Sequence, residues 1–279
     1  MLKNYIFILL TLTTSILIAC DSGLHKQREK KYNPKKQIEL ANSIQKNRSS
    51  PLKRQAEKNL KEKAKKQEKW LLITSLKKQV QKVISSVNQD KINIKANEPP
   101  DQFGMKNGTF KIIMGNPSQQ TYNSPEGQEN RRQFYSSLNY DKKKIRKFGI
   151  ILNKITLDNV NRGQLHTNIT NAGRYHSQFQ FERIINKIKE VQDKLNYLDI
   201  KDLRTISIKL EEIEMLKTFW QTSMNNLIKE YEDNQYGIQT DSQKLIEHVK
   251  EKYANILQKE IPKIDTLAND INKILKVVN

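Results

Sequence analysis

The spacing of apolar residues predicts helices from Trp70 to the end of the chain. In the first of these segments the apolar residues recur at intervals of three and four, which places them on one helix face and predicts that they pack in a core. They are Trp70, Ile73, Leu76, Val80, Val83, Ile84 and Val87. No segment of the sequence shows a convincing alternation of apolar and polar residues typical of a half-buried strand. The pattern therefore predicts an all-α fold.

The chain from residue 97 to 124 is rich in proline, glycine and asparagine, and contains the turn dipeptide Asn107-Gly108. Such a segment predicts an irregular connection, with one short helix or ribbon around Phe110–Met114. Ser124-Pro125 ends it. Serine accepts hydrogen bonds from the first free amides of a helix, and proline suits the first turn. We therefore expect a helix to begin there and to run to about Tyr140.

Five more helical segments follow, each with an apolar stripe. Asp141 is predicted to cap the first of them, and Gly149 in its middle is predicted to permit close contact with another helix. Asp241 is expected to cap the penultimate helix, and Pro262 to end it. The residues expected on the five buried faces are Ile145, Phe148, Leu152 and Ile155; Phe181, Ile184, Ile185, Ile188, Val191, Leu195 and Leu198; Leu203, Ile206, Leu210, Ile213, Leu216, Trp220, Leu227 and Tyr231; Leu245, Val249, Ile256 and Leu257; and Ile264, Leu267, Ile271, Ile274, Leu275 and Val278. We expect a compact bundle of about six to eight helices behind a disordered basic tether.

The N-terminus has the pattern of a bacterial lipoprotein signal. Lys3 precedes an apolar stretch, Tyr5–Ile18, that is too short for a comfortable transmembrane helix. The stretch ends in Leu17-Ile18-Ala19-Cys20, which resembles the lipobox whose cysteine is acylated. The alternative is an ordinary secretory signal with a chance cysteine. Because Cys20 is the only cysteine, we predict that it carries the lipid and that the mature chain has no disulfide.

The positive charge of the chain is concentrated beside this lipid. The net charge is +20, and residues 24–69 hold 16 Lys or Arg against 5 Asp or Glu. From Asp21 to about Pro51 the chain is polar without an apolar period, which predicts a disordered, solvated tether. Residues 52–69 have only a thin apolar stripe and predict a helical stalk or a frayed helix start. The alternative role for these lysines is attraction to anionic head groups or acidic polymers. The predicted domains are a signal peptide, 1–19; a lipidated basic tether and stalk, 20–69; and an α-helical domain, 70–279.

Several function classes find no support in the sequence. Arginine supplies only 10 of the 50 basic residues, whereas base readout relies on arginine, so we expect no nucleic-acid partner. Phosphate loops, a nucleophile elbow and a Cys–His pair are missing from the sequence. Glu211, Glu212 and Glu214 point in different directions on a helix and predict a solvated face. The histidines have no metal-ligand spacing and should be surface or partly packed residues. They are His25, His166, His176 and His248. We therefore expect no enzyme, metal or cofactor.

Three stretches carry a resemblance to a known family. They are Asn130–Asp141, with Arg131-Arg132-Gln133-Phe134-Tyr135-Ser136-Ser137-Leu138; Ile145–Ile155, with Phe148-Gly149; and Asp241–Val249. Together with the lipobox and the basic tether, they resemble the paralogous outer-surface lipoproteins of Borrelia spirochaetes, a family that includes the factor H-binding complement regulator-acquiring surface protein. The resemblance runs from about Trp70 to Ile256. It implies a compact fold of roughly seven helices and display on the outer membrane surface.

The resemblance also implies a class of function. Related modules bind factor H, terminal complement components or plasminogen, or have no known ligand. We expect a surface lipoprotein that binds a host protein in immune evasion; the alternatives are an envelope lipoprotein without a host ligand and a plasminogen or matrix binder. In the factor H binder the C-terminal helix builds a homodimer. Here Pro262 interrupts that region, so we expect the terminal segment to fold back and the protein to be a monomer or weak homodimer.

A partner-binding surface is expected on the penultimate helix. If Leu245, Val249, Ile256 and Leu257 point inward, a mixture of cations, an imidazole and an aromatic ring lies at the edge or outside. These residues are Lys244, His248, Lys252 and Tyr253. Judged from spacing alone, a solvated helix face is the alternative. On this interpretation, replacing Lys252 and Tyr253 should weaken ligand capture and leave the thermal midpoint nearly unchanged.

Overall fold

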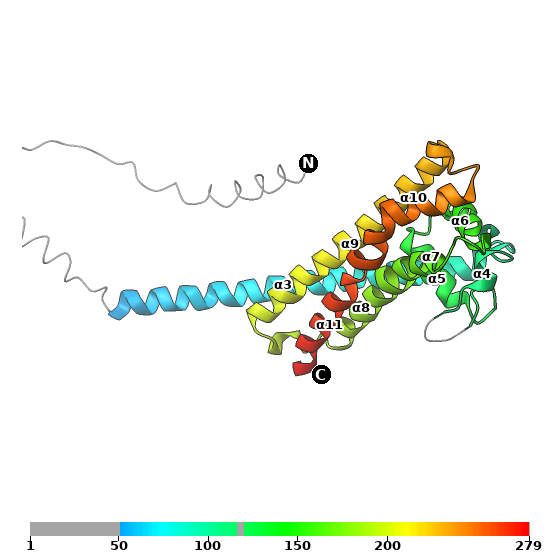
Figure 1. Cartoon of the computed structure of the whole chain (residues 1–279). Helices are drawn as coiled ribbons and strands as arrows, with labels where there is room; N and C mark the ends of the chain where they lie inside the picture. The colour runs from blue at the N-terminus through cyan, green and yellow to red at the C-terminus, as the bar shows by residue number, and fades with distance from the viewer. Residues whose placement is uncertain (1–50, 116–119, 279) are drawn as a thin grey trace, which may run out of the picture. The chain divides into compact units, whose positions relative to one another are not determined.

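The computed structural model describes residues 51–115 and 120–278, and this part of the chain is all-α, as the apolar pattern predicts (Figure 1). Its only β-type pairing is an isolated bridge between Met114 and Thr121. The predicted signal peptide, the Cys20 anchor, the tether and His25 lie outside the described residues. The α-helices are α3 (Pro51–Asn97), α4 (Thr109–Ile112), α5 (Gln128–Ser137), α6 (Lys142–Leu157), α7 (Leu165–Thr170), α8 (Gln180–Glu190), α9 (Ile200–Glu232), α10 (Ser242–Asn255) and α11 (Lys263–Leu275). The 3-10 and π segments are η1 (Gln102–Gly104), η2 (Asn171–Phe179), η3 (Leu195–Tyr197), η4 (Gln235–Gly237), η5 (Ile256–Glu260) and η6 (Lys276–Val278).

Helix α3 is 47 residues long and runs without a break through residue 70, where the stalk was predicted to meet the domain. Residues 54–67 of this helix are exposed, as expected for a helical stalk. The prediction that Trp70 is a core residue is wrong, because its side chain is 63% exposed. The buried stripe begins at Leu76, six residues later, and continues with Val80. Trp70 lies off this stripe because Leu72 and Ile73 occupy the face that meets the bundle.

The connection between α3 and α5 is irregular and well packed. Phe103, Met105 and Phe110 in its described part are buried in the core, whereas Ile112 and Met114 are exposed. The connection passes so close to α6 that a Cβ on Gly149 would lie 3.0 Å from the Phe103 carbonyl oxygen. The close approach predicted at this glycine is therefore present, but the segment that approaches it is the irregular connection and not another long helix.

Helix α5 begins at Gln128, one turn after the predicted start at Ser124. The Ser124 hydroxyl accepts a hydrogen bond from the Gly127 amide at 3.1 Å, so it caps a separate turn. The backbone at Gly127 lies so close to the Thr121 carbonyl that a Cβ on this residue would have no room. The residues from Ser124 to Gly127 therefore form a separate turn, and the helix starts after it. Every residue from Asn130 to Ser137 is buried, because α5 lies in the centre of the bundle.

The remaining helices follow the predicted boundaries closely. Asp141 caps α6 by accepting hydrogen bonds from the amides of Lys143 and Lys144, and Asp241 caps α10 in the same way. The predicted core residues of α6 are confirmed. They are Ile145, Phe148, Leu152 and Ile155. Helices α7 and α8 are joined through the π segment η2 into one continuous rod.

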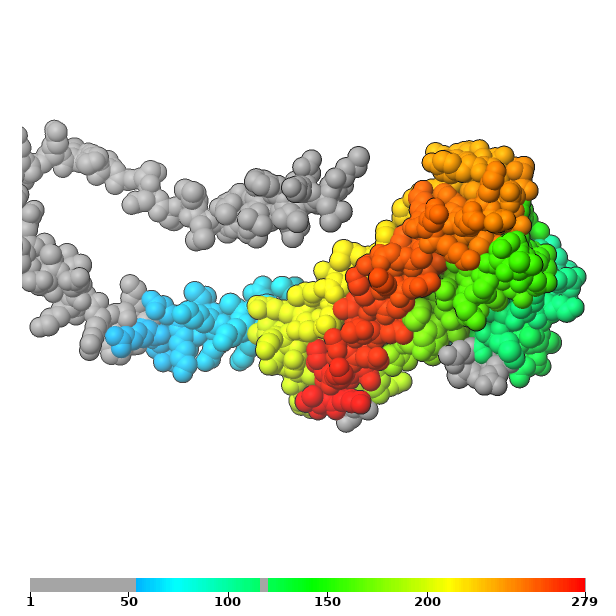
Figure 2. Space-filling view, in the orientation of Figure 1, coloured from blue at the N-terminus to red at the C-terminus, as the bar shows by residue number. Residues whose placement is uncertain are grey.

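Pro262 separates the last two helices, and α11 folds back onto the bundle as predicted. Helix α11 packs lengthwise against α8 and α9, where Figure 2 shows it in red. Its inward residues are fully buried. They are Ile264, Ala268, Ile271 and Leu275. None of the helices in residues 51–115 and 120–278 is long and apolar enough to cross a membrane.

Candidate partner-binding surface

The turn between α9 and α10 sets the predicted partner-binding residues against the end of α9. Lys244, His248 and Lys252 recur at intervals of four along α10, so they share one edge of the helix. Lys244 and Lys252 are exposed, and His248 is half-buried. The side chain of Lys244 lies beside Gly237 of the turn, where an added Cβ would meet its amino nitrogen at 3.5 Å. Three of the four predicted residues therefore form one edge.

Glu230 of α9 contacts three side chains of α10 at this edge. One carboxylate oxygen lies 2.7 Å from Nε2 of His248 and accepts a hydrogen bond from the Tyr253 hydroxyl at 2.9 Å. The other oxygen accepts a hydrogen bond from the Lys252 amino group. Burial alone would raise the pKa of Glu230, but the hydrogen bonds from Lys252, His248 and Tyr253 outweigh it and hold the pKa below its ordinary value. A charged Glu230 thus fixes the side chains of α10 in place.

The expectation that Tyr253 lies outside the core is wrong. Its side chain is only 2% exposed, and burial followed by the neighbouring Glu230 raises the pKa of its phenol. Leu245, Val249, Tyr253 and Leu257 recur at intervals of four, and all are buried. This regular interval was the signal in the sequence. Ile256, which the prediction placed in the stripe instead, is half-buried at the start of the π segment.

Tyr236 is the aromatic residue that the sequence analysis missed. It lies in the α9–α10 turn, is 79% exposed, and has its ring 5.9 Å from that of His248. Its φ of 57° is in the left-handed region, which is a genuine outlier for a bulky residue. The Asn234 side chain holds the turn by accepting a hydrogen bond from the Gln239 amide at 2.8 Å. Gly237 indicated the turn, but nothing in the sequence indicated that the residue before it is strained.

These observations define a corner surface that consists of Tyr236, Lys244, His248 and Lys252. It combines an exposed ring with cationic and titratable groups, the mixture that contacts between proteins favour. No group of His, Cys, Asp or Glu side chains in the described ranges could hold a metal ion. The three histidines in those ranges are half-buried, as predicted. The exposed ring and the cations of the corner surface therefore suit contact with a protein partner.

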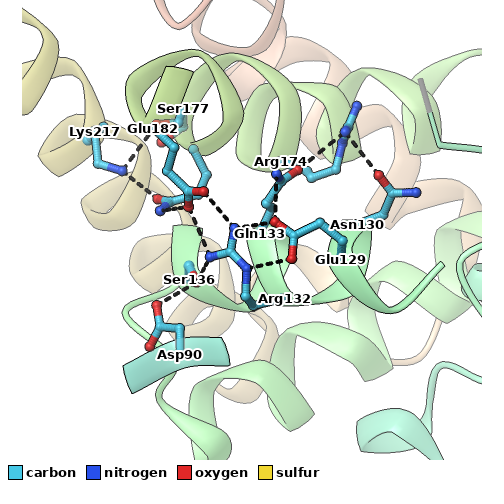
Figure 3. A network of polar contacts seen from close by, with 11 residues as sticks. Asp90, Glu129, Asn130, Arg132, Gln133, Ser136, Arg174, Ser177, Glu182 and Lys217 are labelled. Carbon is cyan, nitrogen blue, oxygen red and sulfur yellow. Dashed lines mark hydrogen bonds and ion pairs between the residues drawn. The ribbon is translucent and has the colours of Figure 1, made fainter. Parts of the chain in front are cut away.

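A second polar cluster lies inside the bundle, where Arg132 of α5 is completely buried (Figure 3). Its guanidinium donates to both carboxylate oxygens of Glu182, at 2.9 and 2.6 Å, and to both of Glu129, at 2.9 and 2.7 Å. Although burial lowers the pKa of Arg132, the hydrogen bonds with Glu129 and Glu182 outweigh it and the net shift is upward. Arg132 therefore stays charged and ties α5 to α8.

The same cluster extends to α3 and α9. Ser136 donates to Asp90 at 2.5 Å, and the Lys217 amino group donates to the carbonyl of Ser177 at 3.1 Å and to the Gln178 side chain at 2.5 Å. Burial lowers the pKa of Lys217 to about 8 and raises that of Asp90, although the hydrogen bond from Ser136 opposes the latter shift. Asp90 and Lys217 thus each bond to neutral groups on other helices of the bundle. This arrangement fits a structural role for the cluster.

The neighbouring Arg131 makes a similar internal contact. It forms a two-pronged ion pair with Glu98, at 2.7 and 2.9 Å, and donates to the carbonyls of Tyr122 and Ser124. Tyr135 donates to the same Glu98 at 3.0 Å. The run from Arg131 to Leu138, which carried the family resemblance, thus joins α5 to the segments around it.

Comparison with known proteins agrees with this resemblance. Residues 92–276 match the model of a family described as Borrelia Bbcrasp-1 domain containing protein. The outer surface lipoprotein BBA64 of Borrelia burgdorferi is 30% identical, with 74% of this chain and 95% of that chain covered and a TM-score of 0.64. A search of curated proteins found no match.

Two further solved structures are similar. The BBA64 orthologue of Borrelia spielmanii, BSA64, is 26% identical, with 76% of this chain and 96% of that chain covered and a TM-score of 0.66. The Lyme disease associated outer surface protein BBA65 of Borrelia burgdorferi is 24% identical, with 72% and 99% covered and a TM-score of 0.65, which supports the fold alone. The family match and the likeness to BBA64 together show that this chain belongs to the Borrelia family of Bbcrasp-1 domain proteins.

Proposed function

We propose that this protein is a lipid-anchored outer-surface protein that binds a host protein, in evasion of complement, through its corner surface. Membership of the Bbcrasp-1 domain family supports this function, and the description of BBA64 as an outer surface lipoprotein supports the location. Cys20 would carry the lipid, and the basic segment after it would hold the helical domain away from the membrane. Binding by a surface, without catalysis or a cofactor, is the proposed activity.

The observation that carries this proposal is the exposed, strained Tyr236. Backbone strain at a bulky residue costs about 1–3 kcal/mol and persists where the surroundings enforce it, which is common at binding sites. An exposed tyrosine beside cations is also the residue type that dominates binding energy in protein interfaces. The charged Glu230 holds His248 and Lys252 in position below this ring. The corner surface is thus ordered before any partner arrives.

The experiment is a pull-down from human serum with a soluble chain that starts at Asp21. Every buried residue among those described lies at Leu76 or later, so this chain keeps the whole described core. We expect enrichment of a complement protein, either factor H or a terminal component. The double variant Tyr236→Ser, Lys244→Glu should weaken its affinity by about tenfold or more, because a central aromatic anchor is lost.

A matched control uses an exposed tyrosine and an exposed lysine near the other end of α9. Tyr197 and Lys194 meet this description, and Tyr197→Ser, Lys194→Glu should leave capture unchanged. Equal weakening by both double variants would contradict the corner surface as the site. Enrichment of plasminogen or a matrix protein instead of complement, or of no serum protein, would favour the alternatives that the sequence left open.

A further inference from the structure

An open groove of about 500 Å³ lies between the outer faces of α9 and α11. The two helices lie side by side on the surface, where Figure 2 shows α9 in yellow and α11 in red. The α9 side of the groove carries Glu212, Met215, Leu216 and Phe219, and the α11 side carries Lys263 and Leu267. The groove shares no residue with the corner surface.

Most of the side chains that line this groove are apolar. Met215 is 63% exposed and Phe219 is 42% exposed, while Leu216 and Leu267 are half-buried against the core. Ile208, which is also exposed, lies seven residues before Met215 and extends the same face of α9 by two turns. A single exposed apolar residue is ordinary, but several that adjoin one groove mark a contact site.

The shape of the groove favours a protein surface over a small molecule. Sites for small molecules enclose most of the ligand, whereas Met215 and Phe219 remain exposed to solvent here. A groove between two helices is a common seat for the apolar face of a third helix. The exposed stripe of α9, with Ile208, Met215 and Phe219, is itself such a face. A second copy of this chain therefore offers both the groove and a helix that fits it.

The two charged residues of the lining have opposite signs and stand on opposite sides of the groove. Glu212 belongs to α9 and makes no ion pair or side-chain hydrogen bond with a described residue. Lys263 belongs to α11 and pairs with Glu260 one turn earlier, in an exposed contact that contributes little. When two copies face each other across a two-fold axis that bisects the line from Glu212 to Lys263, each acid lies opposite the base of the other copy.

We propose that this groove is a self-association surface, on which a second copy of this chain packs in a symmetric dimer. Met215 and Phe219 of the two copies would cover one another, and the contact between Glu212 and Lys263 would form twice. A surface with one sign of charge would repel its own copy. The contact is small beside the roughly 800 Å² per partner of a stable interface, so we expect a weak dimer with a Kd on the order of 10–100 µM.

The test is sedimentation equilibrium of the Asp21-initiated chain, which lacks the only cysteine, from about 1 to 300 µM. We expect a reversible equilibrium of monomer and dimer. Glu212→Lys and Lys263→Glu should each weaken the dimer by about tenfold or more, because each change sets like charges opposite one another at two contacts. An equimolar mixture of these two variants should dimerise again, since every contact in the mixed dimer joins an acid to a base. A parent chain that stays monomeric throughout, or a mixture that does, would overturn the proposal.

Matched controls separate the groove from general effects of charge and hydrophobicity. Glu126→Lys and Lys106→Glu make the same charge changes at exposed residues outside the groove, and each should dimerise as the parent does. Met215→Gln should weaken the dimer several-fold without lowering the thermal midpoint, whereas Ile150→Gln, at an equally exposed residue of α6, should not weaken it. Equal affinities of groove and control variants would overturn the assignment. So would a monomer whose serum capture falls with Met215→Gln, because the groove would then be a site for a host protein.

Discussion

At the scale of the residue, Tyr253 shows how one neighbour changes a prediction. Tyr253 was expected at the edge of α10 because tyrosine carries a polar hydroxyl, but Glu230 of α9 lies within hydrogen-bond distance of that hydroxyl. Glu230 is 22 positions or more from its lysine and tyrosine partners, so no local pattern in the sequence could bring them together. The ring is buried because α9 supplies an acceptor for the only polar atom of its side chain.

This geometry changes the expected effect of replacing Tyr253. Tyr253→Ala should lower the free energy of unfolding by about 3–5 kcal/mol, because it leaves a cavity in the core. Tyr253→Phe should cost only about 1 kcal/mol, because it removes one hydrogen bond and retains the ring. Unfolding in urea, followed by circular dichroism, measures both values. An alanine variant as stable as the parent would show that the ring contributes nothing to the core.

At the scale of the element, the sequence predicted the helices well where local rules decide them. The caps at Asp141 and Asp241 and the break at Pro262 depend on contacts within a few residues, and all three are where they were expected. The start of α5 was missed because the close passage of Gly127 past Thr121 is a tertiary contact. Trp70 was misplaced for a similar reason. The spacing of apolar residues predicts which face of a helix is apolar. It does not predict where along the helix neighbouring helices cover that face.

The buried Arg132 gives a test of how α5 and α8 are joined. Arg132→Met should destabilise the protein by about 3–5 kcal/mol, because Glu182 would remain buried without its charged partner. Arg132→Met combined with Glu182→Leu should be less destabilising than the single change, since no unpaired charge is then left at that position.

The exposed ion pair between Arg146 and Asp101 supplies the control for this experiment. Arg146→Met should cost no more than about 1 kcal/mol, because solvent screens an exposed pair. Chemical denaturation of the three variants gives the comparison. If Arg132→Met and Arg146→Met lowered the free energy of unfolding equally, burial of the Arg132–Glu182 pair would have no energetic consequence.

At the scale of the whole molecule, the sequence predicted more of the fold than of the binding surface. Many apolar residues, each at helical spacing, independently predict the all-α bundle. The errors at Trp70 and Tyr253 therefore did not change the predicted fold class. The corner surface depends on one strained residue, Tyr236, and on the distant acid Glu230, and neither has a local signal. Three of the four residues of the proposed surface were already in the prediction from the sequence, because Lys244, His248 and Lys252 remain when the apolar stripe of α10 is removed.

The membrane anchor is the last prediction and concerns the whole protein. None of the described helices is long and apolar enough to cross a membrane, and the apolar stretch before Cys20 is shorter than a comfortable span. If Cys20 carries the lipid, Cys20→Ala should abolish acylation and should move the protein from the membrane fraction to the soluble or secreted fraction. Metabolic labelling with a fatty acid and fractionation of cells would measure both effects. The adjacent change Ser22→Ala, which leaves the cysteine in place, is the control and should stay with the membrane. A Cys20→Ala protein that is still acylated, or that still sediments fully with membranes, would show that another feature of the chain holds it there.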